Sequence, residues 1–265
     1  MHFFQSLYFQ KGTNRTLKEQ IYTIPVNEAY ETDCECPLCF LEKKLEQEAV
    51  EYELGTAMME ADHREESNHK GFCRHHFEMM FGSGNKLSLA LVLDTHLDEL
   101  RKKLEKFSKD VKSAENDRSG LFKKSTAFAT AADISAMLSE SEASCMVCEK
   151  MTYTMNRYID VLLYMWANDD EFKAKFDASK GVCLHHMKQL LDAVPKSLKD
   201  KEAGAFISTL FTKQAAELSR IQEDIHKFTL KFDYRFKDME WGTAQDAPFR
   251  TIEKIAGYIH DEDSK

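Results

Sequence analysis

Two stretches of the chain share the pattern Gly-x-Cys-x-His-His, and each follows a Cys-x-x-Cys pair. Residues 71–76 read GFCRHH and residues 181–186 read GVCLHH, while the pairs are CPLC at 36–39 and CMVC at 145–148. Two copies of a compound motif in the same order indicate an internal repeat. This pattern constrains the fold most, because whatever these side chains bind must bring distant parts of the chain together.

The cysteines are best explained by metal binding. The N-terminal sequence MHFFQSLYFQKG lacks the basic segment, apolar core and cleavage site of a secretory signal, and no apolar run approaches the ~20 residues of a membrane helix. We therefore expect a cytoplasmic protein, in which thiols stay reduced. Seven cysteines in clustered spacings then favour metal sites over disulfides. The seventh, Cys34, precedes the first pair, and we expect it to be incidental.

Three cysteines and one histidine are a common ligand set for tetrahedral zinc. In a helix, Cys73 and His76 share a face, whereas His75 points elsewhere. We therefore predict two metal sites, one made of Cys36, Cys39, Cys73 and His76, the other of Cys145, Cys148, Cys183 and His186. Because helix starts are irregular, His75 and His185 are possible substitutes or outer groups.

Two questions about these sites stay open. A helix from Cys148 to Ala167 would be about 28 Å long, and the chain must return that far for Cys183 to meet Cys148. We predict closure within each half as the simpler arrangement; the alternative is an exchange, in which each Cys-x-x-Cys pair meets the Cys-His pair of the other half. Zinc suits a closed site, and an iron–sulfur cluster is the alternative, although such clusters usually use tighter runs of cysteine.

The composition predicts an all-α fold, because the chain has only 4 Pro and 10 Gly and is rich in helix formers. Residues 151–167 place apolar side chains at helical spacing, and Asp169 follows as a cap for a short helix over 171–179. Long helices over 86–112 and around 207–232 each carry an apolar stripe that we expect to be buried. These faces consist of Met155, Ile159, Leu162, Leu163 and Trp166; Ala90, Leu93, Leu97, Leu100, Leu104, Phe107 and Val111; and Ile207, Phe211, Gln214, Leu218, Ile221, Ile225, Phe228 and Phe232.

These elements predict a sequence of modules along the chain. Residues 1–16 are an upstream extension or a cloning remnant. The first Cys/His module with its long helix covers 17–112, a solvated linker covers 113–124, and the second module covers 125–200. The last part, 201–265, holds a long helix and a tail with a final short helix near 251–258.

Other functional classes find little support. The net charge of −9 argues against a general affinity for nucleic acid. The Glu-x-x-His patterns at Glu60–His63 and Glu223–His226 have the spelling of di-iron ligands. However, the latter pair falls outside the apolar stripe of its helix, and residues 61–70 are most simply a solvated loop. No phosphate loop, nucleophile elbow or dinucleotide fingerprint is present.

Longer stretches of the chain resemble a known family. ECPLC, GFCRHHFEMM, SKGVCLHHMKQLL and the tail KFDYRF with WGTAQDA resemble a bacterial family of unknown function whose members carry one or two CPLC…GFCxxH modules. The resemblance covers about 17–257 and implies that the histidine three residues after the cysteine, His76 or His186, is the partner. The second copy departs from the family pattern, with Met146 and Val147 where Pro and an apolar residue are usual. The family implies no activity.

From these features we expect a non-enzymatic, metal-binding helical protein that acts as a scaffold, interaction module or regulator. Its partner would be another protein rather than nucleic acid or membrane, and a homo-oligomer is possible. The alternative is a redox protein or enzyme with an iron–sulfur or open zinc site, which an open coordination position in a pocket would favour.

Overall fold

All regular structure in the described part of the chain is helical. The structure is a computed structural model that describes residues 15–116 and 126–258. Those ranges contain eleven α-helices, three short 3-10 helices and no strand, so the predicted all-α fold is confirmed. The predicted extension, 1–16, lies outside the described residues except for the start of the first helix. None of the described helices is both long enough and apolar enough to cross a membrane.

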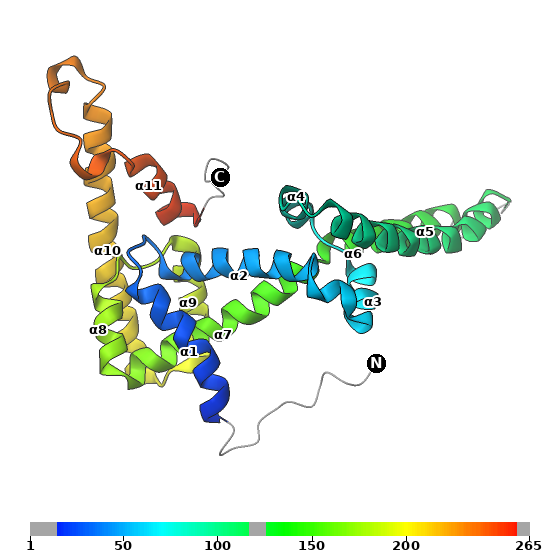
Figure 1. The fold of residues 1–265 in the computed structure, drawn as a ribbon, viewed down its shortest axis with the longest axis horizontal. Coiled ribbons are helices and arrows are strands. Elements are labelled where there is room, and N and C mark those ends of the chain that lie inside the picture. The colour runs from blue at the N-terminus through cyan, green and yellow to red at the C-terminus, as the bar shows by residue number, and fades with distance from the viewer. Residues whose placement is uncertain (1–14, 117–125, 259–265) are drawn as a thin grey trace. The chain divides into compact units, whose positions relative to one another are not determined.

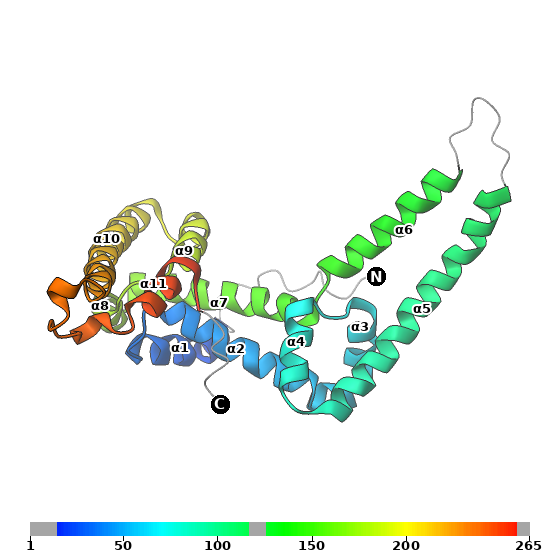
Figure 2. The same ribbon diagram turned by 90° about the horizontal axis from the view of Figure 1, so that it is seen from above.

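The helices are α1 (Arg15–Glu31), α2 (Pro37–Glu53), α3 (Ala61–Lys70), α4 (Arg74–Gly82), α5 (Lys86–Asn116), α6 (Thr126–Ala143), α7 (Met146–Asn168), α8 (Asp170–Ala178), α9 (Leu184–Ser197), α10 (Asp200–Leu230) and α11 (Ala247–Ala256). The short 3-10 helices are η1 (Thr56–Met59), η2 (Tyr234–Phe236) and η3 (Gly242–Ala244). Figures 1 and 2 show them in two views.

The helices form two compact units. The first unit combines residues 1–44 with 154–265, and the second unit consists of residues 45–153. Both boundaries fall inside helices, one in α2 and one in α7. This division differs from the contiguous ranges expected from the sequence, because the first unit takes one segment from each end of the chain.

The core of the first unit is an aromatic cluster at the meeting point of several helices. Tyr30 of α1 meets Phe172 of α8 edge to face and stacks against Phe176, with ring centroids 5.1 and 5.7 Å away. Phe206 of α10 lies 5.0 Å from Trp166 and 5.7 Å from Phe176. All five side chains are buried, so this cluster holds α1, α7, α8 and α10 together.

The second unit has its own core, formed where α4 and α5 meet the end of α2 and the start of α7. Its buried members are Ala49, Val50, Leu54, Phe72, Met80, Leu89, Val92, Cys145, Met146 and Val147. The backbone N–H of Met146 also donates to the carbonyl of Gly71 at 3.2 Å. The first residues of the Gly-x-Cys motif and those of the Cys-x-x-Cys pair are therefore packed together.

Several predicted elements are confirmed. The five apolar residues predicted for one face of α7, Met155, Ile159, Leu162, Leu163 and Trp166, are all buried. The Asp169 side chain caps α8 by accepting from the backbone N–H groups of Glu171 and Phe172. Glu223 and His226 are exposed, as expected for a solvated helix face.

Other predictions need correction. Residues 61–70 form helix α3 rather than a loop, and His63 pairs there with Glu53 at 2.9 Å. The stripe on α5 is not buried as predicted: Leu93 is half-buried and Leu97 is 60% exposed, because the buried face of this helix carries Leu89, Val92 and His96 instead. On α10 the predicted stripe residues Gln214 and Ile221 are buried. In the first turns, however, Phe206 and Leu210 are buried, whereas the predicted Phe211 is 53% exposed.

The boundaries of two segments also differ from the prediction. The predicted linker begins inside α5, which continues to Asn116, and residues 117–124 lie outside the described part of the chain. The last helix starts earlier than predicted, at Ala247, because Pro248 fits the first turn of a helix.

The glycine of each Gly-x-Cys motif has a backbone conformation that other residues rarely adopt. Gly71 and Gly181 have φ values of +69° and +74°. A Cβ atom on Gly71 would lie 2.6 Å from Cε1 of His96, whose Nδ1 contacts the carbonyl of Asn68 at 2.8 Å. Gly71 therefore meets two requirements, a left-handed turn and close approach of α5.

The close approach of His96 predicts how much stability the protein loses when a methyl group is added at Gly71. Gly71→Ala should lower the free energy of unfolding by more than the about 1–2 kcal/mol of left-handed strain, because His96 must also move. Gly84→Ala is the matched control, since Gly84 has φ +83° but no atom within 4 Å of the added group. Urea denaturation of both variants would measure the difference, and equal losses would contradict a close approach of His96.

Candidate metal centres

The two Cys-x-x-Cys pairs have the same local geometry. Cys36 and Cys145 each stand just before a helix, α2 and α7, and the second cysteine lies in the first turn. The backbone N–H of Cys39 donates to Sγ of Cys36 at 3.4 Å, and that of Cys148 donates to Sγ of Cys145 at 3.5 Å. This turn places both sulfur atoms of a pair on the same side of the chain.

The two Gly-x-Cys-x-His-His motifs also match. Cys73 and Cys183 occupy the N-cap positions of α4 and α9, with φ/ψ of −71°/164° and −71°/166°. His76 and His186 follow in the first turn, and both are buried. Each motif therefore presents one sulfur and one imidazole at the start of a helix.

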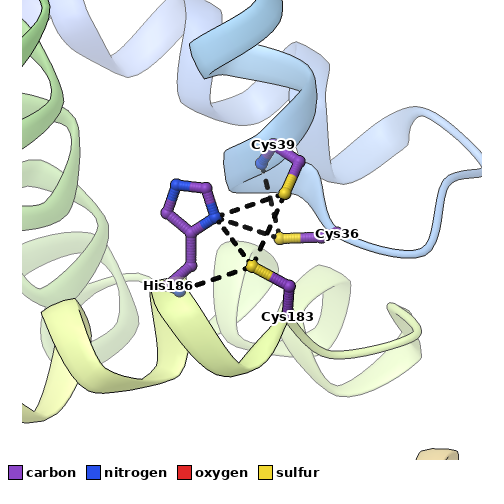
Figure 3. Close-up of side chains that lie close together, drawn as sticks. All are labelled: Cys36, Cys39, Cys183 and His186. Carbon is purple, nitrogen blue, oxygen red and sulfur yellow. Dashed lines mark hydrogen bonds between the residues drawn. The ribbon is translucent and has the colours of Figure 1, made fainter. Parts of the chain in front are cut away.

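Four of these side chains converge in the first unit. Cluster 1 consists of Cys36 and Cys39 from α2 and its N-terminal flank, with Cys183 and His186 from α9 (Figure 3). The Nδ1 atom of His186 lies 3.5, 3.3 and 3.2 Å from the sulfur atoms of Cys36, Cys39 and Cys183. The sulfur atoms of Cys39 and Cys183 are 3.6 Å apart.

The other four side chains converge in the second unit. Cluster 2 consists of Cys73 and His76 from α4 and its N-cap, with Cys145 and Cys148 from the start of α7. The Nδ1 atom of His76 lies 3.1, 3.2 and 3.4 Å from the sulfur atoms of Cys73, Cys145 and Cys148. The sulfur atoms of Cys73 and Cys148 are 3.8 Å apart.

These distances fit a single tetrahedral ion. Zinc bonds of about 2.3 Å to sulfur and about 2.0–2.1 Å to nitrogen place sulfur atoms about 3.8 Å apart and sulfur and nitrogen about 3.6 Å apart. A disulfide would bring two sulfur atoms to about 2.05 Å. All seven cysteines lie within the described residues and all are free. Each cluster therefore has the ligand set and the dimensions of a Cys3His site.

The pairing corrects the arrangement predicted from the sequence. Cys36 and Cys39 meet Cys183 and His186, not Cys73 and His76, so the predicted closure within each half is wrong and the exchanged alternative is correct. Helix α7 has 23 residues and α8 has 9. At ~1.5 Å per residue, α7 carries the chain about 34 Å from Cys145 and α8 returns over only about 13 Å. Cys183 therefore stays near the C-terminal end of α7. The other two sulfur atoms of its cluster come from Cys36 and Cys39 at the start of α2.

The thiols within each cluster oppose one another's ionisation. Burial raises the pKa of Cys145, but the contact with His76 and the backbone N–H groups of Cys148 and Cys73 together outweigh this effect and lower the pKa to about 6. Burial and the neighbouring Cys145 raise the pKa of Cys148. In cluster 1 the neighbouring thiols of Cys36 and Cys39 lower the pKa of Cys183, while Cys183 and Cys36 raise that of Cys39. One thiolate forms readily in each cluster, and a divalent cation would make further thiolates favourable.

Carboxylates lie behind both imidazoles. The Nε2 atom of His76 makes a hydrogen bond of 3.1 Å with Glu46, whereas that of His186 faces Glu42 at 3.5 Å without a hydrogen bond. A carboxylate on the far nitrogen fixes the ring of a metal-binding histidine and makes it a better ligand. His75 also contacts Glu46, at 3.1 Å, so the group formed by Glu46, His75 and His76 is best explained as an outer partner of cluster 2.

The remaining candidates lie outside the clusters. His185 is exposed and contacts Gln189 at 2.9 Å. Burial and the neighbouring Cys36 raise the pKa of Cys34 to about 11, and Cys34 belongs to neither cluster. The structure thus places His186 in cluster 1 and His76 in cluster 2, and leaves His75, His185 and Cys34 outside both clusters.

A buried lysine holds both ligand loops of cluster 1. Lys254 of α11 is fully buried, and its ammonium group donates to the carbonyl of Glu35 at 2.7 Å and to that of Lys180 at 2.5 Å. Burial lowers the pKa of Lys254, and the Glu35 carboxylate 3.6 Å away opposes this shift. Glu35 directly precedes Cys36, and Lys180 lies three residues before Cys183.

Two arginines complete this network. The Glu35 carboxylate accepts from Arg220 at 2.5 Å and from Arg250 at 3.4 Å, and Arg250 also binds Asp224 at 3.0 Å. Glu35 and Asp224 are both buried, so their charges are compensated within the unit. No sequence pattern indicates a role for Glu35, Lys254, Glu42 or Glu46, because lone charged residues at these spacings resemble any solvated helix face.

Comparison with known proteins identifies a family. Residues 17–262 match DUF6062, a family of unknown function. The chain belongs to DUF6062. No curated protein and no solved structure with significant similarity was found. Membership of DUF6062 therefore brings no activity with it, and the two clusters carry the functional argument.

The exchanged pairing of this DUF6062 protein predicts the metal content of double variants. Cys39→Ser with Cys183→Ser damages cluster 1 alone and should leave one metal ion for each chain. Cys39→Ser with Cys73→Ser damages both clusters and should leave none, because loss of a ligand greatly weakens a four-ligand site. Elemental analysis of the two purified variants would measure the metal that remains in each. If Cys39→Ser with Cys73→Ser kept one ion and Cys39→Ser with Cys183→Ser kept none, the sites would close within each half.

The position of Lys254 predicts a selective effect on cluster 1. Lys254→Met should weaken metal binding there roughly tenfold, because both ligand loops lose a shared hydrogen-bond donor. It should also cost about 3 kcal/mol of stability, because the carbonyl groups of Glu35 and Lys180 lose their buried donor. Chelator competition should then remove one metal ion earlier than the other. The control is Lys201→Met at an exposed position of α10, which should change neither quantity.

Proposed function

We propose that this protein binds one zinc ion in each cluster and that the ions lock its helices into a non-enzymatic interaction module. The observation that carries this proposal is the convergence of three sulfur atoms and one imidazole twice in the chain, with separations close to the edges of a zinc tetrahedron. Zinc suits such a site because it has no redox chemistry and accepts a mixed sulfur and nitrogen set.

A single ion fits these clusters better than an iron–sulfur cluster. Several iron and sulfide atoms would have to lie between the ligands and hold them farther apart than a single ion does. The sulfur atoms of Cys39 and Cys183, at 3.6 Å, are already at the separation of two ligands on one ion.

A structural role is supported by the number of ligands. Catalytic zinc usually has three protein ligands and an open position for water or substrate, whereas each cluster here offers four. The metal would join α2 to α9 in the first unit and α4 to α7 in the second. Because such sites rarely exist in an unfolded chain, the binding free energy would also stabilise the fold.

The finer parts of the proposal follow from the chemistry of the chain. We infer a tandem duplication from the two matching motif copies, and a cytoplasmic location from thiols that require a reducing compartment. A protein partner is supported by apolar side chains that stay exposed along α5, among them Leu97 at 60% and Leu104 at 49%.

Metal content tests the proposal directly. Protein purified without oxygen should contain two zinc ions per chain and no iron, and it should show no visible absorption near about 400 nm. A strong chelator should lower the midpoint of thermal unfolding, because metal binding and folding are coupled. Addition of zinc, but not magnesium, should restore the midpoint. Stoichiometric iron with a visible band would instead support the alternative of an iron–sulfur redox protein.

A further inference from the structure

The two clusters have the same ligands but different exposure. In cluster 1 no ligand is more than 5% exposed. In cluster 2 Cys145 and His76 are buried to a similar degree, but Cys73 is partly exposed and Cys148 is exposed. The two clusters therefore have the same types of ligand and differ in how accessible those ligands are to solvent.

The C-terminal segment accounts for the burial of cluster 1. Helix α11 packs against α9 and α10, and Lys254 bridges the two ligand loops. A methyl group on Gly257, just after α11, would lie 3.9 Å from the sulfur of Cys39. Among the described residues of the second unit, no segment takes the corresponding place over Cys148.

Cluster 2 instead borders a hollow. A cavity of about 400 Å³ is lined by Ala143, Cys145, Cys148, Glu149, Thr152 and Tyr153. Small solutes can therefore reach the sulfur of Cys148, and Cys73 lies directly behind it at 3.8 Å. An accessible thiolate with a second thiol next to it is the arrangement found at oxidation-sensitive cysteines.

We propose that Cys148 is an oxidation site at which hydrogen peroxide forms a Cys148–Cys73 disulfide and releases the metal ion of cluster 2, while cluster 1 keeps its own. This inference rests on the proposed function, because it requires a metal in both clusters. Under this proposal, oxidation controls whether cluster 2 holds its metal ion, whereas cluster 1 keeps its ion throughout.

The reaction proceeds in two balanced steps. A coordinated thiol is held as the thiolate, which is the nucleophilic form. The Cys148 sulfur attacks one peroxide oxygen, the O–O bond breaks, and the leaving hydroxide takes a proton to become water, so that Cys148 becomes a sulfenic acid. The Cys73 thiolate then attacks this sulfur, the S–O bond breaks, and a second water leaves after protonation. Two thiolates, one peroxide and two protons give one disulfide and two waters.

Loss of the ion follows from the ligand count. The disulfide removes two of the four donors and leaves Cys145 and His76, which cannot complete a tetrahedral site. The start of α4 and the start of α7 would then be joined by a covalent bond instead of a metal ion. A dithiol reductant together with zinc should reverse the change.

The test uses the full zinc-loaded chain carrying Cys34→Ser, so that every remaining thiol belongs to a cluster. Peroxide is added in the presence of a colorimetric zinc chelator, and free thiols are alkylated and mapped by mass spectrometry at each time point. One zinc ion should leave at least roughly tenfold faster than the other, in step with a disulfide between Cys148 and Cys73. Peptides containing Cys36, Cys39 and Cys183 should stay unoxidised during this phase.

A second pair of variants tests the role of access without removing a ligand. Thr152→Trp places a large side chain in the hollow and should slow the first release several-fold. Thr212→Trp at an exposed position of α10 is the matched control and should leave the rate unchanged. Equal rates for both variants would contradict approach through the hollow.

The outcomes separate this inference from the proposed function. A chain that binds two zinc ions but releases them together, or oxidises cluster 1 first, contradicts the oxidation site alone. Release of one ion without a disulfide at Cys148 contradicts it as well. A chain that holds no zinc before peroxide is added contradicts the proposed function, and the inference with it.

Discussion

The mutual approach of three sulfur atoms and one imidazole is the interaction on which each unit depends. Thiols this close cannot all ionise unless a cation balances them, as the opposed pKa shifts of Cys39 and Cys183 illustrate. A cation of the right size would turn this repulsion into four bonds and would fix the starts of two helices against each other. The aromatic core of the first unit and the apolar core of the second would then pack around helix ends that the cation holds in place.

The sequence was most informative where chemistry and periodicity agreed. The paired motifs predicted which eight side chains would converge, and the face of α7 followed from apolar spacing alone. What could not be predicted was the partnership between motifs, since it depends on the lengths of α7 and α8 and on where α2 begins. The stripes on α5 and α10 were misjudged for a related reason: periodicity finds an apolar face, but neighbouring helices decide which part of it is covered.

The charged groups around the clusters show another limit of sequence reasoning. Lys254 is far from Cys36 along the chain, and its role rests on two backbone carbonyls that no residue pattern reveals. Glu46 and Glu42 lie one turn apart on α2, yet one supports His76 and the other faces His186. No sequence pattern marks these charged side chains, because any helix with a solvated face contains similar residues. Their importance depends on burial and on the direction in which each carboxylate points.

The exchanged pairing also bears on the origin of the chain. A polypeptide with only one half would carry a Cys-x-x-Cys pair and a Cys-His pair that belong to different coordination spheres. Such a half-length ancestor could complete a site only by associating with a second copy, and two copies would complete two sites at once. Fusion of the two genes would then turn an obligate association into a single molecule, and it would free each half to change its own surroundings independently.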